Sequence, residues 1–165
     1  MSEFRPDRIL ATLARHKVEY VVIGGIAARA WGSPSTTVDL DICYSRDEPN
    51  LERLVGALTE LRARLRGAPK DLPFKLDSRA LRMGDSFTFD TTSGPFDCLG
   101  TPAGTTGFPE IAANAELLDI AGSNVRVASL DDLIRMKRAA GRPKDRAEVE
   151  QLGALRDERR GRKRP

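Results

Sequence analysis

The sequence has few of the residues that build disulfide frameworks, histidine metal sites or membrane spans. Its 165 residues include one histidine and two cysteines, which excludes a histidine metal cluster and disfavours a Ser-His-Asp triad. We expect Cys43 and Cys98 to be reduced packing residues, because two cysteines make no disulfide framework. No apolar run could cross a membrane, and the charged start MSEFRPDR lacks the apolar core of a signal peptide. A cytoplasmic location is therefore expected.

Aromatic residues are also scarce, at 5% of the chain, and their scatter predicts no stacking platform for single-stranded nucleic acid. The net charge of +3 is concentrated at one end, because residues 156–165 carry six basic and two acidic side chains. We expect residues 153–165 to be a basic, disordered tail that serves solubility, with weak attraction to nucleic-acid phosphate as the alternative. Residues 1–152 are long enough for one domain.

Apolar periodicity predicts alternating helices and strands, and therefore an α/β fold. Helices are predicted over residues 6–17, 26–31, 51–65, 130–140 and 143–155. Strands are predicted over residues 20–23, 37–44, 86–90, 95–99, 117–120 and 125–127. Residues 66–77 and the glycine- and threonine-rich residues 100–109 are predicted to be loops.

The strand predicted over residues 37–44 places two aspartates together. Period-two alternation puts Val38, Leu40 and Ile42 on one face. Thr37, Asp39 and Asp41 then share the other face. Two carboxylates this close repel each other, and one resists ionisation unless a cation lies between them. Mg²⁺ is the natural cation, because it takes carboxylate oxygens and bridges to phosphates. An Asp-x-Asp pair alone is more often an ordinary solvated strand face.

A glycine pair precedes these aspartates, at the point where the strand over residues 20–23 turns into a helix. Gly24 and Gly25 would let the backbone approach a phosphate, although a tight turn explains them equally well. The combination of an apolar-Gly-Gly turn, a helix and Thr-x-Asp-x-Asp resembles the nucleotidyltransferase superfamily. The resemblance implies a polymerase-beta-like fold, with a mixed central sheet flanked by helices. It also implies that Asp39 and Asp41 bind divalent metal together with a third carboxylate from a later strand.

Two aspartates are candidates for that third carboxylate. Asp97 lies in the short apolar strand GPFDCL, where a lone aspartate is otherwise unexplained. Asp90 ends the preceding strand, a place where turn chemistry accounts for aspartate. We therefore favour Asp97 over Asp90.

The segment SLDDLIRMKRAAGRPKDRAEVEQL resembles the closing part of the AbiEii-like (MenT-type) nucleotidyltransferases, typically toxins of toxin–antitoxin systems and their relatives. Lys137, Arg142 and Asp145 match that pattern. Lys137 falls on an apolar helix stripe, so it either snorkels to water or reaches a buried anion such as a triphosphate. Asp145 would suit the first turn of a helix in any case. Ser35 departs from the family, which often has arginine there.

The resemblance implies transfer of a nucleoside monophosphate from a nucleoside triphosphate to an acceptor hydroxyl, with release of pyrophosphate. The implied acceptor is an RNA such as the 3′ end of tRNA, and a cognate antitoxin is a possible partner. The implied ligands of two Mg²⁺ ions are Asp39, Asp41 and Asp97, and Asp97 would also accept the hydroxyl proton. The implied nucleotide-binding residues are Gly24, Gly25, Thr37, Lys137, Arg142 and Asp145, of which Lys137 is also catalytic. The alternatives are a small-molecule nucleotidyltransferase of the aminoglycoside-modifying kind and an inactive binding module.

Overall fold

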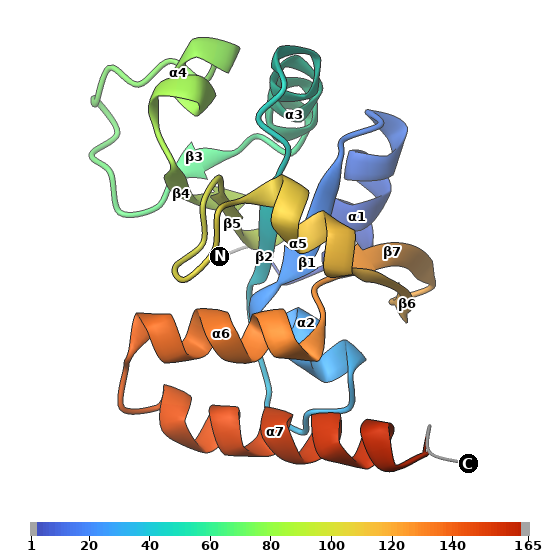
Figure 1. The fold of residues 1–165 in the computed structure, drawn as a ribbon. Coiled ribbons are helices and arrows are strands. Elements are labelled where there is room, and N and C mark those ends of the chain that lie inside the picture. Colours follow the sequence, from blue (N-terminus) through green and yellow to red (C-terminus); the bar gives the residue numbers. More distant parts are fainter. Residues whose placement is uncertain (1–2, 163–165) are drawn as a thin grey trace.

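A computed structural model describes residues 3–162 of the chain (Figure 1). The strands are β1 (Tyr20–Ile23), β2 (Leu40–Tyr44), β3 (Arg64–Leu65), β4 (Ser86–Thr91), β5 (Gly94–Leu99), β6 (Glu116–Ile120) and β7 (Ser123–Val127). The helices are α1 (Pro6–Arg15), α2 (Gly24–Ala30), α3 (Glu48–Glu60), α4 (Ser78–Met83), α5 (Phe108–Asn114), α6 (Leu130–Ala140) and α7 (Asp145–Arg162).

The strands form one mixed sheet in the order β3-β4-β5-β2-β1-β7-β6. The central strand β2 pairs antiparallel with β1 and parallel with β5. A second parallel pair joins β1 to β7, and the outer pairs are antiparallel hairpins or edge contacts. The predicted α/β class with a mixed central sheet flanked by helices is confirmed.

The core forms where the apolar stripes of the helices meet the sheet. Ile9 and Leu13 of α1 and Leu54 and Leu58 of α3 are fully buried, as their helical spacing predicts. Each buried leucine or isoleucine contributes about 1.5–3 kcal/mol relative to an exposed one. The two cysteines are buried in the same core and are free thiols, as expected.

Strand β4 differs from the central strands, because only one of its faces is covered. Phe87 and Phe89 are buried, whereas Ser86, Thr88 and Asp90 alternate with them and are exposed. In the antiparallel register, Thr88 lies opposite Asp97 of β5. The open face of β4 is therefore the face that carries Asp97.

The strand predicted over residues 37–44 is shorter than expected, since β2 begins at Leu40. Val38 was predicted to share one face with Leu40 and Ile42, but these two are fully buried and Val38 is 72% exposed, so this prediction was wrong. The Thr37 hydroxyl donates to the backbone oxygen of Asp39 at 3.3 Å and to its Oδ1 at 3.0 Å. Local side-chain bonds of this kind compete with the sheet ladder. Asp39 therefore precedes the strand that carries Asp41.

Three short elements, β3, α4 and α5, were not predicted. The side chain of Asp77 accepts a hydrogen bond from the Ala80 N–H and caps α4. Pro109 lies in the first turn of α5, where a missing N–H costs nothing. These helices have six and seven residues, which is too short for their periodicity to stand out in the sequence.

The C-terminal segment corrects the expectation of a disordered tail. Residues 153–162 continue α7, and residues 163–165 lie outside the described part of the chain. Arg156 and Arg160 both bond to Asp131 of α6 at 3.2 Å, and Arg159 lies 4.4 Å from the ring centre of Trp31. Three of the six basic residues in 156–165 therefore contact α6 or the end of α2. Over residues 3–162, the structure contains no helix with the length and apolar character that spanning a membrane requires.

Candidate active site

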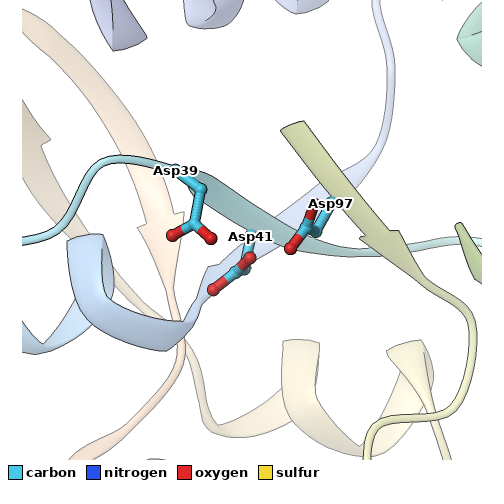
Figure 2. A group of neighbouring side chains, drawn as sticks. All are labelled: Asp39, Asp41 and Asp97. Carbon is cyan, nitrogen blue, oxygen red and sulfur yellow. The ribbon is translucent and has the colours of Figure 1, made fainter. Parts of the chain in front are cut away.

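Three carboxylates meet where β2 and β5 lie side by side. The parallel register puts Asp41 directly opposite Asp97, and Asp39 lies just before β2. One oxygen from each of the three groups lies within 4.8 Å of the others. Figure 2 shows the three carboxyl groups on the same side of the two strands. Strand alternation brings Asp41 and Asp97 to one face, as the sequence predicted, although Asp39 reaches it from a loop.

Asp90 does not belong to this group. Its side chain is 59% exposed and bonds to Arg66 at 3.1 Å, whereas the side chain of Asp97 is only 16% exposed. Of the two candidates for the third carboxylate, the structure places Asp97 beside the pair.

The glycine pair is required by crowding around the aspartates. Gly24 has a φ of +70°, and a Cβ there would lie 2.0 Å from Oδ2 of Asp41. A Cβ on Gly25 would lie 2.9 Å from the hydroxyl oxygen of Thr37. Only glycine accepts both the backbone conformation and the contact at position 24. The turn therefore holds Asp41 against the backbone.

The three carboxylates are electrostatically strained when no cation lies among them. Burial, then the charges of Asp39 and Asp97, raise the pKa of Asp41 to about 8. Burial also raises the pKa of Asp97, against the opposing effect of Arg66. Carboxylate oxygens at this spacing are the donors that hard divalent cations take. The residues present therefore fit a divalent metal site.

Arg66 is a site residue that sequence reasoning missed. Its guanidinium donates to Asp97 Oδ1 at 2.9 Å, to Asp90 Oδ1 at 3.1 Å and to the Phe89 oxygen at 2.8 Å. The position was predicted to be the start of a loop, and no sequence signal indicates a partner 31 residues away. Arg66 supplies a cation beside the carboxylates.

The opposite wall of the site comes from α6 and α7, which lie side by side at the bottom of Figure 1. Lys137 is bonded to Glu148 and lies 3.9 Å from Asp145 Oδ1. Its side chain is only 14% exposed, so it does not snorkel freely to water. Arg142 donates to Asp145 at 2.9 Å and 3.2 Å. Lys137 and Arg142 are therefore already paired with carboxylates.

A cleft of about 260 Å³ separates the two walls. Most of the predicted site residues line it, namely Gly24, Gly25, Thr37, Asp39, Asp41, Asp97, Lys137 and Arg142, as do Ser35, Lys144 and Glu148. Asp145 lies behind this lining, where its 2%-exposed carboxylate holds Arg142. Since the helix dipole alone explained Asp145 in the sequence, its burial as an ion-pair partner was not predicted.

Comparison with solved structures identifies the fold as that of the nucleotidyltransferases. The antibiotic-resistance factor ANT(2″)-Ia is 18% identical with a TM-score of 0.56, and the match covers 95% of this chain and 90% of that one. The lincosamide antibiotic adenylyltransferase LnuA, solved with lincomycin bound, is 12% identical with a TM-score of 0.61, covering 91% and 95%. A candidate nucleotidyltransferase from Thermotoga maritima is 18% identical with a TM-score of 0.55, covering 94% of each chain. No protein-family profile and no curated protein sequence matches the chain.

Proposed function

We propose that this protein is a metal-dependent nucleotidyltransferase that transfers a nucleoside monophosphate from a nucleoside triphosphate to an acceptor hydroxyl. The observation that carries the proposal is the cluster of Asp39, Asp41 and Asp97, whose oxygens lie within 4.8 Å of one another at one end of the cleft. The nucleotidyltransferase fold of the chain supports it.

The reaction forms one bond and breaks one bond at the α-phosphorus. The acceptor oxygen attacks this phosphorus, the bond to the bridging oxygen of the β-phosphate breaks, and pyrophosphate leaves with the electron pair. Divalent ions held by Asp39, Asp41 and Asp97 would polarise the α-phosphate and lower the pKa of the attacking hydroxyl. In this proposal Asp97 takes the hydroxyl proton, because it is the carboxylate of the cluster that lies on β5, beside the exposed face of β4.

The triphosphate fits against the wall built by α6 and α7. Lys137, Arg142 and Lys144 line the cleft there and bring three cations to face two carboxylates, Asp145 and Glu148. In this proposal the phosphate oxygens replace Glu148 as the partner of Lys137 and draw Arg142 toward the cleft. Preorganised cations that meet developing charge lower the barrier to transfer.

The acceptor we propose is the hydroxyl of an RNA 3′ end, such as that of tRNA. This rests on the resemblance of residues 129–152 to the AbiEii-like (MenT-type) toxins. The same resemblance suggests a toxin of a toxin–antitoxin pair, with a cognate antitoxin as partner and Mg²⁺ as the metal. A second candidate is a small-molecule acceptor, favoured by the neighbours: one structure of ANT(2″)-Ia contains adenylyl-2″-tobramycin, and LnuA contains lincomycin.

One experiment separates these candidates from an inactive binding module. The purified protein is incubated with Mg²⁺ and each α-labelled nucleoside triphosphate, with total tRNA, tobramycin or lincomycin as acceptor. We expect label in the tRNA with one or more nucleotides, and none when EDTA is added. Label in tobramycin or lincomycin alone would select the second candidate. No transfer from any nucleotide, by a folded protein that still binds Mg²⁺, would contradict the proposed activity.

A further inference from the structure

We propose that the groove between strand β3 and residues 66–77 is a second binding site, which holds the single-stranded end of a polynucleotide acceptor. This inference rests on the proposed function, because it locates the acceptor of that reaction. Residues 66–77 form the long loop that projects beside β3 in Figure 1. The groove has a volume of about 680 Å³, larger than the cleft that holds the three aspartates.

The charge of the groove favours an anionic ligand. Arg62, Arg64 and Lys70 line it and are exposed. Over residues 3–162, none of the three has a carboxylate oxygen within 4.0 Å, unlike Arg46, Arg82 and Arg135 elsewhere on the surface. Asp90 is the one acidic residue of the lining, and Arg66 bonds to it. Lysine and arginine side chains placed in this way bind phosphodiester groups.

The apolar residues of the groove favour a ligand with unstacked bases. Leu72 and Phe74 line it and are 47% and 36% exposed. Phe74 is the one aromatic among the large apolar side chains that the described part of the chain exposes. An exposed ring beside a row of cations is the arrangement with which proteins bind single strands. The sequence predicted no stacking platform from its few scattered aromatics, and it could not show that Phe74 lines the same groove as Arg62, Arg64 and Lys70.

The position of the groove suits the acceptor rather than the nucleotide. The sheet order β3-β4-β5-β2-β1 puts the metal-binding carboxylates of β2 and β5 between the groove, at β3 and β4, and the glycine turn after β1. In an in-line displacement the attacking and leaving oxygens lie on opposite sides of the phosphorus. With the triphosphate on the side of α2, α6 and α7, the acceptor hydroxyl arrives from the side of β4 and β3.

Arg66 connects the two sites physically. Its guanidinium touches Asp90, which lines the groove, and Asp97, which lines the catalytic cleft. The exposed face of β4, with Thr88 and Asp90, forms the floor between them. An RNA strand whose phosphate backbone lies along Arg62, Arg64 and Lys70 can therefore bring its terminal hydroxyl across the exposed face of β4 to Asp97. A polycationic drug would be repelled by the basic side chains of this groove.

The test is binding of a fluorescein-labelled single-stranded RNA of about ten nucleotides, measured by anisotropy in EDTA without nucleotide. The triple variant Arg62→Gln, Arg64→Gln, Lys70→Gln removes three groove cations. Each lost phosphate contact reduces the slope of log K against log salt by about 0.7 for a single strand. We therefore expect the slope to fall by about 2 in magnitude, and the affinity to fall at least about tenfold at low salt.

The matched control is the variant Arg8→Gln, Lys17→Gln, Arg126→Gln, which removes the same charge from exposed positions outside the groove. We expect its salt slope to equal that of the wild type. Phe74→Leu keeps the apolar volume and removes the ring, so the affinity should fall at least about fivefold with no change of slope. The melting temperatures of all variants are measured to verify folding.

Two results would overturn the inference. One is RNA binding that is undetectable in the wild type. The other is an equal loss of slope in the groove variant and in its control, which would mean that only total charge matters. Neither result tests nucleotidyl transfer itself, because binding is measured without metal or nucleotide. If the protein transfers label to tobramycin or lincomycin but does not bind RNA, the proposed activity stands and the groove has no part in it.

Discussion

The two walls of the catalytic cleft differ in how their charged side chains are balanced. On the sheet wall, Asp39, Asp41 and Asp97 face one another, with Arg66 as the one cation bonded to any of them within residues 3–162. On the helical wall, Lys137 is bonded to Glu148, and Arg142 to Asp145. The sheet wall needs a cation from outside to become neutral, whereas on the helical wall Lys137 and Arg142 already have carboxylate partners and Lys144 adds a third cation. The first wall therefore fits a divalent cation, and in the proposed function the second exchanges a carboxylate for a phosphate.

The largest effect is expected from removing one charge of the sheet wall. Asp41→Asn should lower the rate of nucleotidyl transfer by about 10³-fold or more, because a metal ligand worth several kcal/mol is lost. The fold should survive, since asparagine is neutral like the protonated carboxyl that burial, and then the charges of Asp39 and Asp97, favour at this position. Single-turnover kinetics and a melting curve of the metal-free protein measure the two effects. A large fall in the melting temperature would instead mean that the carboxylate is structural.

The choice between Asp97 and Asp90 gives the next contrast. Asp97→Asn should cost about as much activity as Asp41→Asn, because both carboxylates lie in the cluster. Asp90→Asn, which removes only an exposed partner of Arg66, should change the rate by about threefold or less, since exposed ion pairs contribute under about 1 kcal/mol. The two variants make the same change, from a carboxylate to an amide, at two partners of Arg66, so each controls for the other. Equal losses in both would move the third metal ligand away from Asp97.

A smaller effect is expected on the helical wall. Lys137→Met keeps the apolar stem and the helix propensity but removes the ammonium group. If Lys137 contacts the triphosphate, this costs on the order of 2 kcal/mol, or more than tenfold in affinity or rate. Nucleotide titration with Mg²⁺ measures the affinity.

The control for Lys137→Met is Glu148→Gln, which frees the lysine from its partner. Because the triphosphate then has no carboxylate to displace, Glu148→Gln should bind nucleotide as tightly as the wild type or more tightly. Unchanged dissociation constants and rates in Lys137→Met would restrict the lysine to a structural role between α6 and α7.

The smallest effect concerns stability. With a pKa near 8 in the folded state and 3.8 as the ordinary value, Asp41 keeps a proton on folding that the unfolded chain has lost. The contribution of Asp41 to the free energy of unfolding of the metal-free protein therefore falls as the pH rises from about 4 to about 8. Mg²⁺ must displace this proton, so it should raise the melting temperature more at about pH 8 than at about pH 6, by a few degrees. The pH-dependent difference should vanish in Asp41→Asn.

The sequence was most informative where one periodicity decided the structure. Strand β1 and helix α6 match their predicted limits, since each is a clear apolar pattern with glycine or a capping residue at its ends. The same alternation placed Asp41 and Asp97 on one face, and the unexplained aspartate in an apolar strand distinguished Asp97 from Asp90. Such features are local, so a single sequence contains them.

What the sequence did not predict depends on contacts between distant residues. The bonds of Arg66 to β4 and β5 join segments that share no pattern. The Thr37 hydroxyl holds Asp39 in a loop where alternation predicted a strand. Basic residues of α7 looked like a tail because their partners are distant in sequence, Asp131 on α6 and Trp31 just after α2. Charge pairing of this kind has no periodicity from which it could be predicted.

Because α7 follows the metal-binding strands in the sequence, the cleft is completed only after those strands have been synthesised. Ser35, in the loop that leads to Asp39, has its hydroxyl 3.4 Å from Oε1 of Gln151, and a Cβ at Gly32 would lie 3.6 Å from the side chain of Leu155. A growing chain emerges at about 5–20 residues per second, N-terminal part first. The metal-binding strands are therefore synthesised several seconds before the helix that braces their loop and walls the cleft. During synthesis, a nascent chain can hold the aspartates without being able to hold the nucleotide.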